Sequence, residues 1–136
     1  MENSNKAGVA NKAVVQSFFD AGNQGDMDTC FALLADDIKW TNTGSHSLSG
    51  TYQGKQQLME ELLGPLFGRL KNGIFTTVVD MVAEGDHVVV RHLGKAETLD
   101  GLAYNNTYCW VVRIRHGQFV EVTEYCDTAL LERVLG

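Results

Sequence analysis

The C-terminal half of the chain consists of four extended segments separated by tight-turn sequences. The extended segments are rich in β-branched and aromatic residues and cover residues 74–84, 87–99, 103–115 and 118–126. The separators are typical of β-hairpin turns: Gly85-Asp86, Asp100-Gly101 and His116-Gly117. Because hairpins place successive strands side by side, this half of the chain predicts an antiparallel meander.

The N-terminal half has helical periodicity instead. Apolar residues fall three and four apart from residue 11 to Gly22, and Asp26 is a good N-cap for a second helix. A short strand is expected over residues 38–42, a loop over 43–54, and a third helix from Lys55 that ends or kinks at Pro65. A last short helix is expected over 128–134, after a cap at Asp127.

Helices followed by an antiparallel sheet predict an α+β fold in which the helices cover one sheet face. A length of 136 residues fits one domain, so we expect a single domain over residues 1–136. Residues 1–8 are polar and are expected to be disordered.

Charge and composition exclude several classes of partner. The formal net charge is −6, whereas nucleic acids and anionic membranes require basic surfaces. Neither a membrane-spanning apolar run nor a signal peptide is visible, and the three cysteines have no metal-binding spacing. We therefore expect a cytoplasmic protein with reduced thiols, and the scattered histidines predict neither a metal nor another cofactor.

One carboxylate stands out in the last extended segment. Val120, Val122, Glu124 and Cys126 share one face, which is apolar except for Glu124. A lone carboxylate on a buried face is costly unless it is paired, protonated or used. Glu124 is therefore the first candidate for an acid or base, and the alternative is a buried ion pair with Arg91 in a pocket that performs no chemistry.

Two further polar residues are candidates for the same pocket. Arg91 shares a strand face with Leu93, and its guanidinium could hold Glu124 or a ligand oxygen if that face lines the pocket. The alternative is that this face meets solvent or a subunit interface. Asn42 follows Trp40 by two residues and could donate to an oxyanion, or bond its own turn instead.

Aromatic side chains supply the expected pocket wall. Tyr108 and Trp110 alternate with residues of the opposite face of the third meander strand, and we interpret them as wall or core. The opposite face of the meander is expected to carry apolar side chains that a homodimer would bury: Val88, Val90, Val111 and Phe119.

Several segments resemble proteins of the nuclear-transport-factor-2-like (NTF2-like) superfamily, and within it the SnoaL-like and ketosteroid-isomerase-like proteins. The resemblance is carried by VVQSFF (14–19), GDMD (25–28), LADDIKW (34–40), HGQFVE (116–121) and EYCD (124–127). It implies a cystatin-like cone, in which N-terminal helices pack on a curved antiparallel or mixed sheet around a pocket, and a homodimer.

The chemistries of these relatives can be compared with the residues present. Positions that correspond to the ketosteroid isomerase acid and base groups hold Phe18, Asn42 and Trp110, so the resemblance argues against that reaction. The epoxide-hydrolase set is incomplete, because Leu93 stands where a second carboxylate is needed, although Arg91, Asn42, Trp40 and Glu124 occupy its other positions. Glu124 does match the acidic residue on the last strand of SnoaL-like polyketide cyclases.

The resemblance and the residues together predict a SnoaL-like enzyme that transfers a proton on a small apolar carbonyl compound, as an isomerase or a cyclase. Glu124 would be the acid/base, with Asn42 and Arg91 anchoring oxygen. The predicted ligand-binding residues are Phe18, Trp40, Leu93, Tyr108, Trp110 and Val122. The alternatives are a non-catalytic small-molecule-binding protein and an epoxide-hydrolase-like enzyme with an incomplete catalytic set.

Overall fold

The computed structural model describes the backbone of residues 2–136 and the side chains of residues 6–136. Its helical elements are α1 (Glu2–Asn23), α2 (Met27–Ala32), α3 (Lys55–Gln57), the π-helix η1 (Leu58–Leu63), α4 (Gly64–Phe67) and α5 (Thr128–Leu135). Its strands are β1 (Leu34–Asn42), β2 (Gly50–Gln53), β3 (Phe75–Glu84), β4 (His87–Lys95), β5 (Asn106–Arg115) and β6 (Gln118–Cys126). None of the described helices is both long and apolar enough to cross a membrane.

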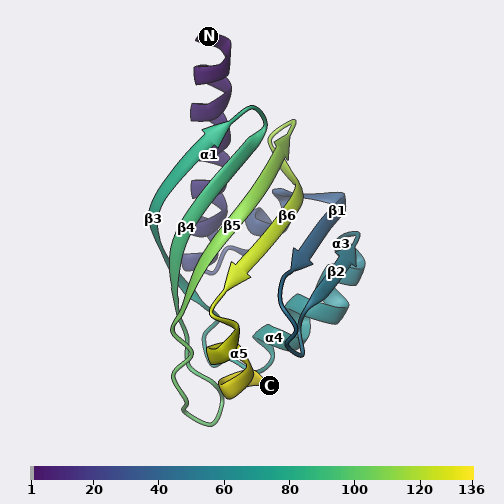
Figure 1. Cartoon of the computed structure of the whole chain (residues 1–136), viewed down its shortest axis with the longest axis vertical. Coiled ribbons are helices and arrows are strands. Elements are labelled where there is room, and N and C mark those ends of the chain that lie inside the picture. The colour runs from purple at the N-terminus through teal and green to yellow at the C-terminus, as the bar shows by residue number, and fades with distance from the viewer. Residues whose placement is uncertain (1) are drawn as a thin grey trace.

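The six strands form one curved, mixed sheet in the order β2-β1-β6-β5-β4-β3. β3 to β6 form the expected antiparallel meander, whereas β1 joins β6 in parallel and β2 pairs antiparallel with β1. Figure 1 shows α1 crossing behind the twisted sheet, with α3 and α4 beside β1 and β2, and α5 below the end of β6. The predicted α+β cone is confirmed.

The first helix is longer than the sequence pattern indicates. It begins at Glu2 and therefore includes backbone that was expected to be disordered. Gly8 explains part of this extension, because a Cβ atom there would lie only 3.3 Å from the Cβ of Ala83 on β3. The small residue lets the first turns of α1 pack closely on the sheet.

Two predictions for the middle of the chain were wrong in detail. The expected loop contains β2, a short and exposed edge strand whose polar sequence has no apolar alternation to reveal it. Pro65 does not end the helical segment, which was one of its two predicted effects, because it lies in the first turn of α4, where the missing N–H is not needed. Just before it, η1 has wide π-helical turns, and Gly64 closes them by donating from its N–H to the carbonyl of Met59.

Both helix caps predicted from aspartates are confirmed. The Asp26 carboxylate accepts a hydrogen bond of 3.2 Å from Thr29 N at the start of α2. The Asp127 carboxylate accepts one of 3.1 Å from Leu130 N at the start of α5. The second cap turns the chain sharply after β6, so that α5 packs across the end of the sheet.

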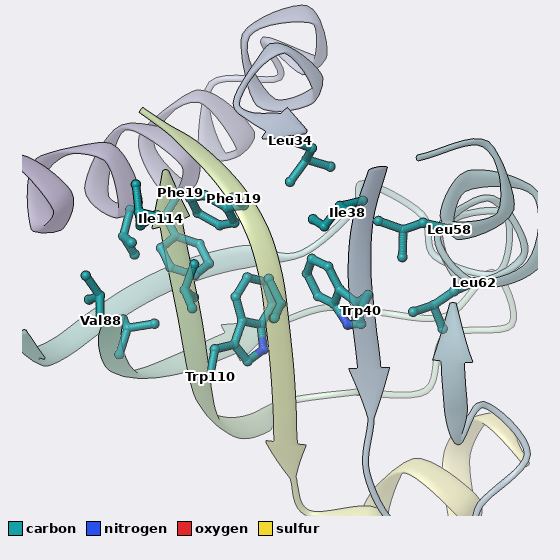
Figure 2. Close-up of a cluster of buried hydrophobic side chains, with 14 residues drawn as sticks. Phe19, Leu34, Ile38, Trp40, Leu58, Leu62, Val88, Trp110, Ile114 and Phe119 are labelled. Carbon is teal, nitrogen blue, oxygen red and sulfur yellow. The ribbon is translucent and has the colours of Figure 1, made fainter. Parts of the chain in front are cut away.

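The main core lies between the concave sheet face and the helices. It includes Phe19, Leu34, Ile38, Trp40, Leu58, Leu62, Val88, Trp110, Ile114 and Phe119 (Figure 2). Val88, Val90 and Phe119 are thus buried inside, and the prediction that they lie on the outer face was wrong. In β4 both alternating faces are apolar, so periodicity does not choose between them. In β6 the register shifts by one residue beside Val120, which turns Phe119 inward.

Candidate functional site

A cavity of about 440 Å³ lies between the concave face of the sheet and the helices. Its wall is mostly aromatic and aliphatic, with side chains from α1, α2, η1 and α4 opposite those from β1, β4, β5 and β6. This volume is in the range of small-molecule pockets. No described residue that lines it is a lysine or an arginine.

Three polar side chains occupy one row across the floor of this cavity. Asn42 on β1 pairs in register with Glu124 on β6, and Glu124 pairs in register with Trp110 on β5. All three residues line the cavity. Because side chains directly opposite each other in a sheet lie about 5 Å apart, this row brings an amide, a carboxyl group and an indole together.

Glu124 is the acidic group of the cavity. Burial raises its pKa from 4.5 to about 7, and a hydrogen bond from Trp40 opposes that rise. The indole Nε1 of Trp40 donates to Glu124 Oε1 over 3.0 Å. A carboxyl group with this pKa can both accept and return a proton near neutral pH.

The backbone at Glu124 is held by the residue that follows β1. The amide N and the hydroxyl Oγ1 of Thr43 both donate to the Glu124 carbonyl oxygen, over 3.1 and 2.8 Å. These bonds prolong the pairing of β1 with β6 up to the carboxyl-bearing residue. They fix the position of Glu124 through the backbone and leave its side chain to the cavity.

Two buried polar atoms beside Glu124 have no hydrogen-bond partner in the described part of the chain. They are Oδ1 of Asn42, whose side chain is 4% exposed, and Nε1 of Trp110, which is 9% exposed. Buried polar groups in proteins are normally paired, so such atoms next to a cavity are candidates for ligand contacts. Figure 2 shows the Trp110 indole against that of Trp40, and the two rings meet edge to face with centroids 4.9 Å apart.

Two tyrosines form another polar part of the wall. The Nδ2 atom of Asn106 donates to the Tyr104 hydroxyl over 2.9 Å, and Asn106 Oδ1 accepts from Asp127 N over 3.0 Å. Burial raises the pKa of both Tyr104 and Tyr108. Both phenols are therefore neutral near pH 7 and able to donate hydrogen bonds.

Arg91 lies outside this cavity. Its guanidinium is bound by Asp80 on β3, with Nε 2.8 Å from Asp80 Oδ1, and its side chain is 62% exposed. Leu93 shares this outer face and is 46% exposed. The expectation that both line the pocket was wrong, because β4 turns Val88 and Val90 inward. The arginine is left in solvent, where its charge carries no desolvation penalty.

The remaining predicted residues divide into two groups. Phe18, Trp40, Asn42, Tyr108 and Trp110 do line the cavity together with Glu124. Val122 is fully buried in the core but does not line the cavity, so its predicted contact with a ligand was wrong. The functional roles of the lining residues remain predictions.

Several cavity residues were not predicted from the sequence, among them His92 and Tyr104. His92 is 3% exposed and faces the cavity from β4, next to Tyr108 on β5. Side chains alternate between the two faces of a strand, so the prediction that Arg91 faces the pocket also placed its neighbour His92 on the outer face. The available signal was the run Val88, Val90, His92, in which a neutral imidazole can continue an apolar face.

Comparison with known proteins supports the fold and leaves the ligand open. Residues 15–122 match the family described as the SnoaL-like domain. No curated protein matches the chain.

Solved structures are similar over most of their length but distant in sequence. An NTF2-like protein of unknown function from Burkholderia pseudomallei is 20% identical, covering 93% of this chain and 97% of that one, with a TM-score of 0.79. A putative SnoaL-like polyketide cyclase from Jannaschia is 18% identical over 94% of each chain, with a TM-score of 0.74. A hypothetical protein from Catenulispora acidiphila with a ketosteroid isomerase-like fold, in complex with trimethylamine, is 16% identical, covering 82% of this chain and 83% of that one, with a TM-score of 0.68.

Proposed function

Because the chain belongs to the SnoaL-like domain family, we propose that it is an enzyme that transfers a proton on a small, mostly apolar carbonyl compound. The observation that carries this proposal is Glu124, a carboxyl group in an apolar cavity whose pKa is raised to about 7 by burial. A base with a pKa near the working pH combines a useful ionised fraction with a useful proton affinity.

The proposed reaction begins with ionised Glu124 removing a proton from the carbon next to the substrate carbonyl. The electron pair of that C–H bond moves into the enolate, and the proton stays on the Glu124 carboxyl group. Return of the proton to another carbon completes an isomerisation, and attack of the enolate on a second carbonyl of the same molecule completes an aldol-type cyclisation. The proton on Glu124 then neutralises the resulting alkoxide.

The neighbours of Glu124 support this role. The N–H of Trp40 holds one carboxyl oxygen, so the other is free for the substrate proton. Asn42 and Trp110 lie on either side of Glu124 in the row, where the amide or the indole N–H can bind the substrate oxygen as it gains charge. Epoxide hydrolysis is not supported, because Leu93 stands where a second carboxylate is needed and because Arg91 lies with it on the outer face.

Hydrogen exchange into simple ketones tests the proposal without knowledge of the natural substrate. We would incubate the protein with 2-tetralone in D₂O and follow loss of the α-proton signals by NMR. We expect wild type to exchange the α-protons faster than buffer alone. In Glu124→Gln the rate above background should be lower by about 100-fold or more. The matched control is Glu121→Gln, since Glu121 lies on the same strand as Glu124, pairs in register with Arg113 on β5 and does not line the cavity. Equal rates in wild type and Glu124→Gln would contradict the proposal.

The second candidate is a protein that binds a small molecule without turnover. It is favoured by the composition of the cavity, where one carboxyl group faces aromatic rings and no described cation balances it. An organic ammonium ion would supply that balance and would also interact with the ring faces. Tight binding of trimethylammonium compounds, together with no ketone exchange, would support this candidate over the enzyme.

A further inference from the structure

His92 is a buried imidazole in the cavity for which the proton-transfer scheme has no role. Its ring lies among three aromatic side chains, with centroids 4.6 Å from Phe19, 4.7 Å from Trp110 and 5.0 Å from Tyr108. The Tyr108 ring is almost parallel to it, at 11°. His92 is two strands away from Glu124, since β5 lies between β4 and β6.

The hydrogen bonding of the ring defines which nitrogen carries the proton. His92 Nδ1 lies 3.4 Å from the carbonyl oxygen of Val90. A carbonyl oxygen only accepts hydrogen bonds, so Nδ1 must be the protonated nitrogen. Burial lowers the pKa of His92 to about 4, which keeps the ring neutral at pH 7. The distal nitrogen, Nε2, then carries a lone pair.

A structural role alone does not account for a histidine here. Phenylalanine would fill the same space among these rings, whereas the imidazole adds a nitrogen lone pair at the cavity wall. A neutral imidazole is useful at this position if the bound molecule supplies a donor to Nε2. The opposite arrangement, with a ligand acceptor at Nε2, is disfavoured because the proton is on Nδ1.

The charges of the cavity lining restrict the charge that a ligand can carry. The described lining has Glu124 as an acidic group and contains no lysine or arginine. A carboxylate or phosphate group on the ligand would therefore be buried beside a carboxyl group without a compensating charge.

We propose that His92 is a specificity residue that accepts a hydrogen bond from a hydroxyl group of the ligand, and that the cavity takes a neutral, flat, hydroxylated ring compound. The hydroxyl is bound at Nε2 of His92, and the part of the ring near the Asn42–Glu124–Trp110 row is the part that reacts. This inference deepens the proposed function and rests on it only for the location of the reacting end.

Paired naphthalene probes test the proposal by binding alone. 2-Naphthol has a hydroxyl donor, 2-methoxynaphthalene has the same ring without a donor, and 2-naphthoate adds a negative charge. Dissociation constants would be measured by calorimetry or tryptophan fluorescence for wild type, His92→Phe and His92→Gln. His87→Phe is the matched control, because His87 begins the same strand with a half-exposed side chain paired to Asp86.

We expect His92→Phe to weaken 2-naphthol binding about tenfold and 2-methoxynaphthalene binding less than twofold. His92→Gln keeps an acceptor and should recover part of the preference, while His87→Phe should change neither. In wild type, 2-naphthoate should bind more weakly than 2-naphthol. Equal losses for the two neutral probes, tighter binding of the anion, or no binding of either neutral probe would overturn the inference.

A spectroscopic measurement on wild type checks the same contact without any variant. The ¹⁵N resonance of His92 Nε2, observed through long-range coupling to the ring protons, should move when 2-naphthol binds and remain in place with 2-methoxynaphthalene. No difference between the probes would overturn the proposal. If the probe preference is found but ketone exchange at Glu124 is absent, the proposed enzyme activity fails while His92 keeps its assigned role.

Discussion

Trp40 and Glu124 are 84 residues apart in sequence, yet the indole Nε1 of the first contacts the carboxyl Oε1 of the second at 3.0 Å. The contact is possible because β1 and β6 are parallel neighbours. Asn42 pairs in register with Glu124, and Trp40 lies two residues before Asn42 on the same face of the sheet. It stabilises the ionised carboxylate against the effect of burial. The proton affinity of the candidate base is therefore set by two opposing interactions that can be separated by mutation.

Trp40→Phe should raise the pKa of Glu124 above its value of about 7, because burial remains while the hydrogen bond is lost. The titration can be followed through the ¹³C resonance of the Glu124 carboxyl carbon. Trp110→Phe is the control, since its Nε1 makes no hydrogen bond to Glu124. A lower pKa in Trp40→Phe would show that the bond does not stabilise the ionised form.

Glu124→Gln should change how stability depends on pH. The pKa of Glu124 is raised on folding from 4.5 to about 7, so its contribution is fully present below pH 4.5 and is lost as pH rises to about 7. Relative to wild type, Glu124→Gln should therefore gain up to about 3 kcal/mol of unfolding free energy across this window, less where cavity water screens the carboxylate. Urea denaturation at pH 4.5 to 8 measures the difference, and a difference independent of pH would contradict a raised pKa.

Arg91→Leu should leave the titration of Glu124 unchanged, because the arginine is on the opposite sheet face. The change should instead raise the pKa of Asp80, which Arg91 now holds below its ordinary value. Its effect on the free energy of unfolding should be small, as expected for a solvent-exposed ion pair. A shifted Glu124 pKa in this variant would mean that the two charges interact across the sheet.

Gly94→Ala should destabilise the protein and disturb the cavity wall. A Cβ atom at Gly94 would lie 2.8 Å from Tyr108 Cε2 and 2.9 Å from Ile74 Cγ2, which is closer than side chains tolerate. We expect a loss of about 1–3 kcal/mol, typical of overpacking, and weaker binding of ring-shaped probes because Tyr108 must move. Gly22→Ala is the control for stability alone, since its Cβ would meet Cys30 Sγ at an ordinary 3.6 Å, while Gly22 itself lines the cavity.

We propose that the outer face of the sheet pairs two copies of the chain. It exposes Val82, Leu93 and Tyr125 by 66%, 46% and 49%. Of the residues expected there from the sequence, Val111 does lie on this face, whereas Val88, Val90 and Phe119 do not. Burial of such a patch in a two-fold dimer is a common arrangement. Light scattering at micromolar concentration should give the mass of two 15.0 kDa chains, and Leu93→Asp should give one. A wild-type monomer would contradict this proposal.

The features that the sequence predicted well depend on local chemistry. The hairpin turns at Gly85 and Gly117 require positive φ angles, 60° and 73°, which glycine adopts without strain. Aspartate caps are equally local. These signals placed the strands of the meander and the short helices, and with them the fold.

The site was harder to predict because it depends on which face of each strand turns inward. In β4 valines occupy both faces, so Arg91 was placed inside and His92 outside, the reverse of the structure. In β6 the register shift beside Val120 moves Phe119 to the inner face of the sheet, and no residue in that segment indicates the shift in advance. Glu124 was placed correctly because it is the single charge on an apolar face, a pattern that does not depend on the neighbouring strands.

The Asn42–Glu124–Trp110 row combines two polar groups that can do chemistry with an indole that also belongs to the main core. The three strands are joined at this row by their backbone hydrogen bonds, which every side chain except proline allows. Exchanging the amide or the acid therefore alters the reactive surface while the strand register is retained, whereas a change at Trp110 also leaves space in the core. A scaffold of this kind can diversify at two residues, and a library randomised at only Asn42 and Glu124 would sample new activities from one fold.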